Sequence, residues 1–496
     1  MKELEAACRK VIVVGRDAEL WLAAGAISRA LGPAGVTVEA VELESKLPHW
    51  AVYPTLPPLE ALHRRLGIDE SRLIRETGGT FSLGWSFGDA SESFFHAWGA
   101  YGQGIDGQDF LPCWLRANRL GLRLPYQDFS LGAVAARLGR VLVSDEDTAR
   151  FGRTDYAYHL PAHRYAALLK AQALSLGVTV QTAAAVNVEE GVGGRISALH
   201  LNGDRLLQAD LFVDTTGADA LLRNAVVGGG GELAERPLVD RVLSGSAPRL
   251  QRLPPFASVR ASEAGWTALF PTQMGTQVVH AYSTEFASDE EAIAAASSAA
   301  QYPIEEFTIA PISGRSMSRH WVGNVVALGA SAAPLDPMHG ADLHALQLGV
   351  VHLLELFPAS ADYGAESAEY NRVLGESLRR IRDYQDAYYR LNSNKGAFWE
   401  CARSSPRSAE LDHRIATFMA RGEVAPMEYD SFSPDSWRAM LIGLRVLPES
   451  WPPAVDLVPA EVLGSQIHQI IDFIRSKVLQ QADHGAQLKR IERAVA

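Results

Sequence analysis

The first 43 residues constrain the fold more than any other part of the chain. Residues 10–14 (KVIVV) form a short β-branched run that ends at Gly15, and an apolar helical pattern follows as far as Leu31. The pair Gly32-Pro33 stops this helix, and residues 36–43 (VTVEAVEL) then alternate like a second strand. A strand, a glycine turn, a helix and a strand in this order predict a βαβ unit on a parallel sheet.

The rest of the chain adds mainly strands up to about residue 330 and mainly helices after residue 340. The expected strands cover residues 178–182, 186–189, 196–201, 209–214, 269–279 and 323–328. The expected helices cover residues 161–176, 343–356, 368–392 and 461–491, the last as one or two helices. Four consecutive glycines at 228–231 predict a flexible loop. The pattern therefore predicts an α/β protein with an interleaved second sheet and a helical C-terminal part.

Composition excludes several classes of protein. A chain of 496 residues with 47% hydrophobic and 21% charged residues is ordinary for a soluble globular protein. The net charge of −12, with no basic run, makes nucleic acid a poor candidate for a partner. No stretch approaches the roughly 20 apolar residues that span a bilayer, and the short apolar run near the start does not read as a signal peptide. Three widely spaced cysteines (Cys8, Cys113, Cys401) favour a reducing cytoplasm and give no metal-ligand spacing.

The turn after the first strand is a degraded dinucleotide-binding motif. The G-x-G-x-x-G pattern provides a tight turn, close approach to a diphosphate and close packing of helix on strand. In residues 15–20 (GRDAEL) only Gly15 remains, Asp17 brings a negative charge to an anion site, and Leu20 adds bulk. The acidic residue expected at the end of the second strand is present as Glu42, and Arg16 offsets some of the negative charge.

Two interpretations of this motif remain open. In one, a weakened FAD site survives because other contacts hold the cofactor. In the other, the βαβ unit remains as a scaffold and the cofactor has been lost.

Several segments together resemble the flavin-dependent tryptophan halogenases, in the same order and at similar spacing. They are residues 11–24, the segments TFSLGWSF (80–87), DTTG (214–217), GWTALFP (265–271) and GNVVALGASAAPLDP (323–337), and the pairs Tyr370-Asn371, Phe398-Trp399 and Ser436-Trp437. The resemblance implies an FAD-dependent monooxygenase-like fold. We expect a module at residues 1–390 that includes the substrate subdomain, and a helical region at 391–496 packed on it.

The resemblance also implies a chemistry and its partners. In this family reduced FAD, supplied by a separate flavin reductase, reacts with oxygen and halide to give hypohalous acid. A lysine then presents this oxidant to an indole-like substrate, and a glutamate assists removal of the arene proton. The family positions that bind flavin correspond to Gly15, Ala18, Glu42, Gly217 and Gly329. The substrate positions correspond to His96, Trp266 and Phe270, and a homodimer is expected from the family.

The sequence departs from the family at the residues that carry this chemistry. The family lysine is Ser82, which provides no amine, and the family glutamate is His339. The serine-threonine pair at the halide site is Gly340-Ala341, and the second tryptophan of the G-W-x-W hallmark is Ala268. The glycines of the flavin loop are also absent from residues 50–54 (WAVYP), and a family arginine is replaced by Asp219.

Both new chemical roles and plain structural roles are open to the substituted residues. His339, with Asp336 three residues before it, is a candidate general base. Ser82 is a weaker candidate nucleophile, because no G-x-S-x-G elbow is present. His96, Trp98 and Tyr101 are candidates for an aromatic pocket, with core packing as the simpler account.

The sequence thus leaves two hypotheses about function. The first is a halogenase-like flavoprotein that is unable to halogenate but retains some flavin monooxygenase activity. The second is a non-enzymatic pseudoenzyme that binds a small aromatic ligand or a partner protein such as an active paralogue. The two differ in whether the chain holds FAD.

Overall fold

The chain folds into two compact units, each assembled from three separate segments. The computed structural model describes residues 8–88, 93–143, 145–203, 205–227, 237–312, 319–360 and 362–494. Unit 1 consists of the described parts of Met1–Gly78, Leu160–Asp240 and Pro311–Arg380. Unit 2 consists of the described parts of Gly79–His159, Arg241–Ala310 and Ile381–Ala496. The glycine run expected to form a loop at 228–231 lies outside the described residues.

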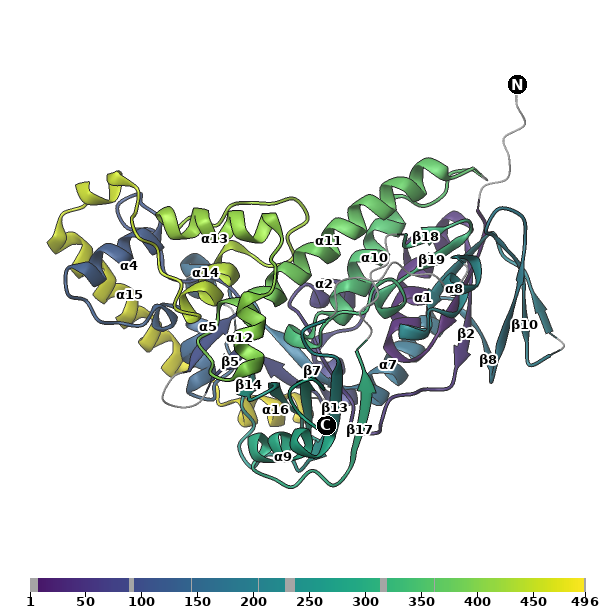
Figure 1. Ribbon diagram of the computed structural model, residues 1–496, viewed down its shortest axis with the longest axis horizontal. Coiled ribbons are helices and arrows are strands. Elements are labelled where there is room, and N and C mark those ends of the chain that lie inside the picture. Colours follow the sequence, from purple (N-terminus) through teal and green to yellow (C-terminus); the bar gives the residue numbers. More distant parts are fainter. Residues whose placement is uncertain are drawn as a thin grey trace. The chain divides into compact units, whose positions relative to one another are not determined.

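Unit 1 is built on a six-stranded sheet with the order β18-β19-β12-β1-β2-β8. Its strands are β1 (Lys10–Gly15), β2 (Thr37–Leu43), β8 (Thr179–Ala183), β12 (Leu211–Thr215), β18 (Trp321–Val322) and β19 (Val325–Ala327). Strand β1 is central and pairs in parallel with β2 on one side and β12 on the other. Figure 1 shows β1 and β2 in purple, and both belong to the predicted βαβ unit.

Helices and a small sheet complete unit 1. The helices are α1 (Asp17–Leu31), α2 (Leu59–Leu66), α3 (Glu70–Thr77), α7 (Ala162–Ser175), α8 (Leu221–Val227), α10 (Asp342–Glu355) and the first part of α11 (Gly364–Leu391). The small sheet has the order β11-β10-β9, with β9 (Val186–Glu190), β10 (Ile196–Leu201) and β11 (Arg205–Leu207). A short strand, β3 (Val52–Pro54), lies in the loop after β2.

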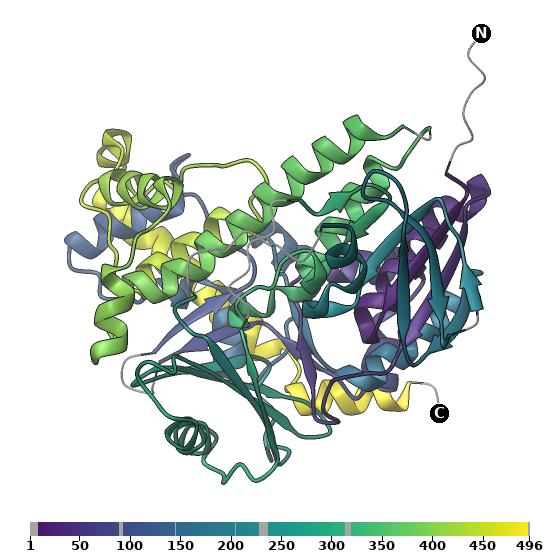
Figure 2. The same cartoon turned by 45° about the vertical axis from the view of Figure 1, so that its right-hand side comes forward.

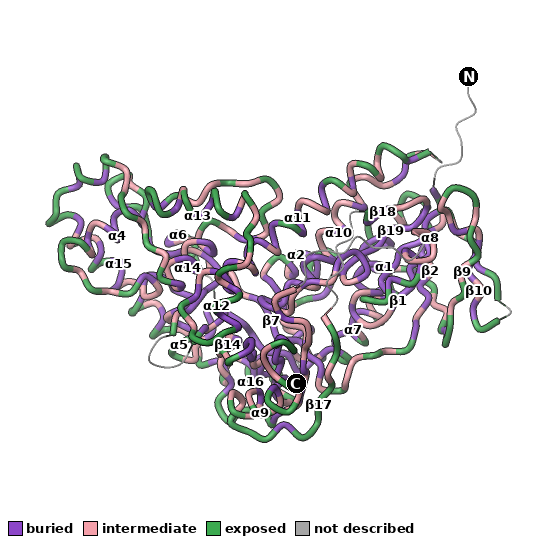
Figure 3. The backbone as a smooth tube through the Cα atoms, in the orientation of Figure 1, coloured by how far each residue is buried: buried purple, intermediate pink, exposed green. Residues whose placement is uncertain are grey.

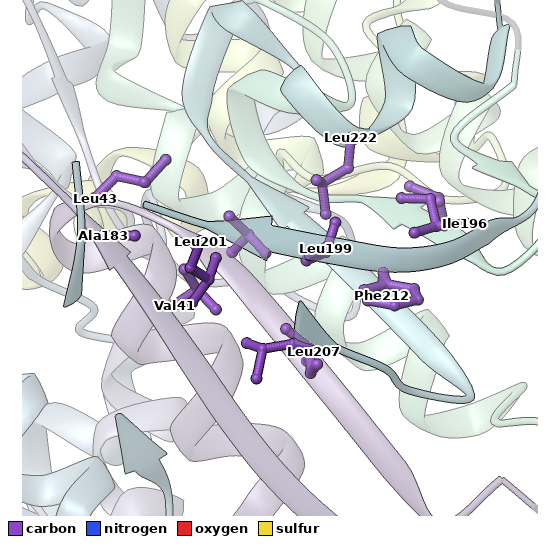
Figure 4. Packing of buried hydrophobic residues seen from close by; sticks show 12 residues of the cluster. Val41, Leu43, Ala183, Ile196, Leu199, Leu201, Leu207, Phe212 and Leu222 are labelled. Carbon is purple, nitrogen blue, oxygen red and sulfur yellow. The ribbon is translucent and has the colours of Figure 1, made fainter. Parts of the chain in front are cut away.

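The core of unit 1 forms where apolar side chains of the two sheets meet. Figure 4 shows Leu199 and Leu201 of β10 packed with Phe212 of β12 and Val41 of β2. Helix α1 is almost entirely apolar, and ten of its residues from Ala18 to Ser28 are buried. Figure 3 shows this region in the colour of buried residues. The burial of these side chains supplies the main driving force for folding of the unit.

Unit 2 is built on a seven-stranded sheet with the order β17-β13-β16-β15-β14-β5-β6. Its strands are β5 (Gly84–Phe87), β6 (Phe94–Ala97), β13 (Arg241–Ala247), β14 (Ala257–Ser262), β15 (Gly265–Pro271), β16 (Thr276–Tyr282) and β17 (Phe307–Pro311). Strand β4 (Thr80–Ser82) pairs instead with the start of β7 (Ala157–Pro161) in an antiparallel arrangement. Figure 2 shows α9 (Asp289–Ala300) end-on beside the teal strands, where Ala292 and Ala296 are buried against the sheet.

The remaining helices of unit 2 come from two parts of the chain. They are α4 (Phe110–Arg119), α5 (Leu131–Arg137), α6 (Glu146–Phe151), α12 (Ala397–Ser404), α13 (Ala409–Arg421), α14 (Pro434–Gly443), α15 (Ala460–Gln480) and α16 (His484–Arg493). The last two confirm the helical pattern expected at 461–491, as two helices. The predicted fold class, α/β with a helical C-terminal part, is confirmed.

One predicted strand is wrong. The single strand expected at 269–279 is a hairpin of β15 and β16, in which Leu269 pairs with Val278. The chain reverses at a tight turn, where the backbone N–H of Thr272 donates to the carbonyl of Gly275 at 2.8 Å. The apolar residues on both sides of this turn hid it in the sequence pattern.

Candidate functional site

The turn between β1 and α1 has a backbone that favours glycine at two positions. Gly15 pairs with Thr215 of β12, and a Cβ atom at Gly15 would lie 2.0 Å from the Thr215 hydroxyl oxygen. Asp17 has a φ of 53°, a left-handed conformation that favours glycine. The place of the motif's second glycine is therefore taken by Asp17 in a backbone conformation that favours glycine.

The hydroxyl of a tyrosine of the same unit lies near the N-terminus of α1. The first N–H groups of a helix have no partner within the helix, and they form a site for anions. Arg16, at the N-cap, makes no capping hydrogen bond with its side chain. Burial raises the pKa of Tyr53, which lies on β3, well above its usual value, so the hydroxyl stays neutral. The neighbouring N–H of Ala18 acts in the opposite direction and lowers the pKa of this hydroxyl.

A carboxyl group lies beside this tyrosine. The carboxyl of Glu19 packs on Gly329, where an added Cβ would lie 2.9 Å from Oε1, and the N–H of Ala330 is 3.5 Å from the same oxygen. Burial raises the pKa of Glu19 to about 8, with further contributions from Asp342 and Asp17. Burial together with Asp336 raises the pKa of Asp342 to about 6. The motif thus faces a cluster of carboxyl groups that are hard to ionise.

Arg16 links the two loops that follow β2 and β12. Its Nε donates to the carbonyl of Glu44 at 2.8 Å, and its Nη1 donates to the carbonyl of Thr216 at 2.7 Å. The same nitrogen lies 3.4 Å from Asp219, whose carboxylate also accepts a hydrogen bond from Lys46 at 2.5 Å. The Arg16 guanidinium therefore makes its hydrogen bonds and its ion pair with other groups of the protein.

The remaining predicted flavin positions also have partners within unit 1. Glu42 accepts a hydrogen bond from Lys170 at 2.6 Å, and the Lys170 ammonium lies 5.3 Å from the centre of the Trp21 ring. Gly217 has a φ of 79°, which explains the glycine, and its carbonyl accepts a hydrogen bond from Ser331 at 3.0 Å.

His339 lies in a short buried turn of unit 1. Residues Met338–Gly340 form one 3₁₀ turn, in which His339 is fully buried and has a φ of 66°. Asp336 accepts a hydrogen bond from the N–H of Met338 at 2.8 Å, so its carboxylate caps this turn. A Cβ on Gly340 would lie 2.6 Å from Cγ of Pro54, which places the ring of Pro54 directly against the turn.

Ser82 belongs to unit 2, at the end of β4. Its side chain is buried, and its hydroxyl donates to the carbonyl of Gly84 at 3.3 Å. Strand β4 is fixed by pairing of Ser82 with Ala157, and the N–H of Phe81 lies 3.3 Å from Nε2 of His484. The position of the family lysine thus holds a serine, whose hydroxyl is bonded to the carbonyl of Gly84 at the start of β5.

The predicted substrate residues are packed into the interior of unit 2. Trp266 is fully buried, and its indole N–H donates to the Tyr389 hydroxyl at 2.5 Å. Phe270 packs edge-on against Trp85 and His159, with ring centres 5.5 and 5.6 Å apart.

The residues expected to line an aromatic pocket pack against neighbouring aromatic rings. His96 lies 3.2 Å from the hydroxyl of Tyr384 and 4.8 Å from the ring of Trp98. Burial lowers the pKa of His96 to about 3, so its imidazole is neutral at physiological pH. Tyr101 stacks on Tyr126 at 5.0 Å.

Sequence reasoning missed Glu19 and Lys170. Glu19 stands inside the glycine motif, where a carboxylate is as unexpected as Asp17, so the motif itself carried the signal. The pairing of Lys170 with Glu42 joins residues 128 positions apart, and no local pattern predicts it. Within the described ranges, no three histidine, cysteine, aspartate or glutamate side chains gather as a metal site. In the same ranges, no helix is both long and apolar enough to cross a membrane.

The parallel sheet with a βαβ start and the interleaved second sheet define an FAD-dependent monooxygenase-like protein. The model of the tryptophan halogenase family matches residues 10–460, so this chain belongs to that family. Tryptophan 7-halogenase RebH of Lentzea aerocolonigenes is 24% identical over 506 aligned residues, which cover 91% of this chain and 92% of RebH.

Two solved structures extend the similarity to three dimensions. BrvH, a flavin-dependent halogenase from Brevundimonas sp. BAL3, is 27% identical with a TM-score of 0.90, covering 98% of this chain and 99% of BrvH. Xcc4156, a flavin-dependent halogenase from Xanthomonas campestris, is 28% identical with a TM-score of 0.91, covering 98% of this chain and 99% of Xcc4156. The family predicted from the sequence is therefore confirmed.

The residues of unit 1 do not fit the diphosphate of a dinucleotide. Such a group needs free N–H donors at the helix N-terminus and room for close approach of its oxygens. Here the hydroxyl of Tyr53 lies beside the N–H of Ala18, and the carboxyl of Glu19 packs on Gly329. Additional negative charge beside Asp17 and Asp342 would be repelled.

Proposed function

We propose that this chain is a member of the tryptophan halogenase family that does not halogenate and acts as a non-enzymatic binding protein. One observation carries the proposal. Ser82 takes the place of the family lysine, and its hydroxyl is bonded to the carbonyl of Gly84. A hydroxyl carries no positive charge and forms no haloamine, so it cannot replace the lysine in presenting hypohalous acid.

The next lysine along the chain has a different partner. Lys170, the next lysine along the chain, is bonded to Glu42 at 2.6 Å in unit 1. His339 provides an imidazole in place of a carboxylate, so it cannot stabilise a cationic arene by charge. The relatives' dependence on flavin and their use of an indole-like substrate are therefore not carried over as an activity of this chain.

The proposal also names the class of molecule that the protein binds. We favour a partner protein such as an active paralogue over a small aromatic ligand, because His96, Trp98 and Trp266 are buried among other aromatic side chains of unit 2. A flavin reductase is a partner only under the hypothesis of residual monooxygenase activity.

The test is a bromination assay on the purified full-length chain. The reaction contains L-tryptophan or indole, FAD, a flavin reductase with its reductant, oxygen and bromide. We expect no brominated product above the reaction without the chain, measured by mass spectrometry. RebH in the same mixture is the positive control. A brominated product that depends on the chain would contradict the proposal.

A further inference from the structure

We infer that Tyr53, Glu19 and Arg16 form an internal ligand of the dinucleotide groove, so that unit 1 is complete without FAD and does not take it up. This inference rests on the proposed function, because a halogenating enzyme would need this groove open. It assigns to three side chains of this chain the contacts that a diphosphate makes in a dinucleotide-binding protein.

The first contact is the approach of Tyr53 to the start of α1. The N–H of Ala18 points out of the helix N-terminus, where the helix dipole places partial positive charge. Burial raises the pKa of the Tyr53 hydroxyl, and the neighbouring N–H of Ala18 lowers it. A neutral hydroxyl beside this N–H takes space that an anion would need, without bringing a full charge.

The second contact is the carboxyl of Glu19 on Gly329. Glycine leaves space for the close approach of another group to the backbone, and here the Glu19 carboxyl takes that space, with Oε1 2.9 Å from a Cβ built on Gly329. Asp342 and Asp17 interact unfavourably with the ionised form of Glu19. A diphosphate would bring about two negative charges beside Asp17 and Asp342, at a large electrostatic cost in a partly buried site.

The third contact is the link made by Arg16. Its guanidinium donates to the carbonyls of Glu44 and Thr216, which belong to the loops after β2 and β12. In a parallel α/β sheet, ligands bind in the crevice outside the carboxyl ends of the strands, at such loops. Arg16 therefore joins the two sides of the crevice and is held there by the protein.

The loop that carries Tyr53 is also held at its next residue. Pro54 packs on Gly340, where a built Cβ would lie 2.6 Å from the proline Cγ and 3.0 Å from the proline carbonyl oxygen. The segment Val52–Pro54 is thus fixed at α1 through Tyr53 and at the turn of His339 through Pro54. Entry of a cofactor would have to break both contacts.

The test is a titration of the full-length protein with FAD, followed by calorimetry and by the visible spectrum of the flavin. For the natural sequence we expect no saturable binding, which corresponds to a Kd above about 1 mM. A triple variant, Asp17→Gly with Glu19→Ala and Tyr53→Ala, removes the Tyr53 side chain and two carboxyl groups from the start of α1. We expect the triple variant to bind FAD at least about tenfold more tightly than the natural sequence.

The matched control is Tyr165→Phe. Tyr165 is a buried tyrosine of unit 1 whose hydroxyl lies 2.6 Å from Nε2 of His63. This variant removes a buried hydroxyl of unit 1 but leaves Tyr53, Glu19 and Asp17 in place. We expect it to bind FAD no better than the natural sequence, and tighter binding here would show that general loosening, and not the internal ligand, controls uptake.

Two results would overturn the inference. One is micromolar binding of FAD by the natural sequence. The other is a triple variant that is folded by circular dichroism but binds no more tightly than the natural sequence. If the triple variant does not fold, Tyr53→Phe is titrated with FAD beside the natural sequence. Tighter binding by Tyr53→Phe supports the inference, and equal binding by the two proteins overturns it. Neither result bears on the bromination assay, so the inference and the proposed function fail separately.

Discussion

At the scale of single residues, the substitutions fall on groups that do chemistry while their backbone positions are kept. Asp17 retains the left-handed φ of 53° that a glycine would adopt, and His339 has a φ of 66° in its turn. Ser82 keeps its place in a paired strand but bonds to its own connection. Restoring single side chains should therefore restore little of the family's activity.

The double variant Ser82→Lys with His339→Glu tests this expectation. We expect no bromoindole from the variant in a reaction with indole, FAD, a flavin reductase with its reductant, oxygen and bromide, because the groove of unit 1 remains filled. Mass spectrometry of the product measures the outcome, and circular dichroism confirms the fold. Bromoindole formed by the double variant would mean that the groove admits flavin in spite of Tyr53 and Glu19.

The carboxyl of Glu19 should make stability depend on pH. Its pKa in the folded protein is raised from 4.5 to about 8, mainly by burial and then by Asp342, Asp17 and Asp214. A carboxyl with a raised folded pKa contributes stability that is fully present below about pH 4.5 and is lost as pH rises through 8. We expect Glu19→Gln to remove this loss, with a gain on the order of 2–4 kcal/mol over the natural sequence near pH 9.

Urea unfolding at several pH values between 5 and 9 measures the effect of Glu19→Gln. The control is Glu449→Gln, which changes an exposed carboxyl and should leave the pH dependence as it is. Equal stability of Glu19→Gln and the natural sequence across this range would show that the Glu19 carboxyl is well solvated.

At the scale of elements, the sequence predicted the parts with strong local patterns. Strand β10 was expected at 196–201 and occupies Ile196–Leu201, and α1 ends at Leu31, just before Gly32-Pro33. The turn at 272–275 was missed because apolar residues flank it on both sides. The partners of Glu19, Arg16 and Glu42 could not be predicted, since they depend on which distant loops meet at the ends of the strands.

The contact of β1 with β12 gives a prediction at this scale. A Cβ on Gly15 would lie 2.0 Å from the hydroxyl oxygen and 2.4 Å from the carbonyl oxygen of Thr215. Gly15→Ala must therefore separate two central strands, and we expect it to destabilise the fold by at least about 2 kcal/mol.

The control for Gly15→Ala is Gly464→Ala in α15, where nothing lies within 4 Å of the built Cβ. Replacing this helical glycine should stabilise the protein by about 1 kcal/mol in thermal or urea unfolding. If Gly15→Ala is as stable as Gly464→Ala, the strands have room that the structure does not show.

At the scale of the whole molecule, both units contain buried histidines that resist protonation. Burial lowers the pKa of His96 and His159 in unit 2 to about 3, and that of His63 and His344 in unit 1 to about 4. A histidine with a lowered folded pKa is neutral in both states above 6.5. Below that pH the unfolded chain binds protons that the folded protein does not, so stability falls as pH falls.

The histidines and Glu19 together predict an optimum of stability near pH 6.5. Below this pH the buried histidines lower the free energy of unfolding as pH falls, and their combined effect exceeds the opposite effect of Glu19 and Asp342. Above this pH the contribution of Glu19 to the free energy of unfolding continues to fall until about pH 8. We therefore expect the free energy of unfolding to fall steeply from pH 6.5 to 4.5 and gently from 6.5 to 8, as measured by urea denaturation.

The variant His159→Gln removes one of the buried histidines, whose Nδ1 lies 3.2 Å from the carbonyl of Pro271. It should make the fall in stability below pH 6.5 less steep. The exposed His413, changed to Gln as a control, should leave both slopes unchanged. A flat profile between pH 4.5 and 6.5 would mean that the buried histidines take up protons in the folded protein as readily as in the unfolded chain.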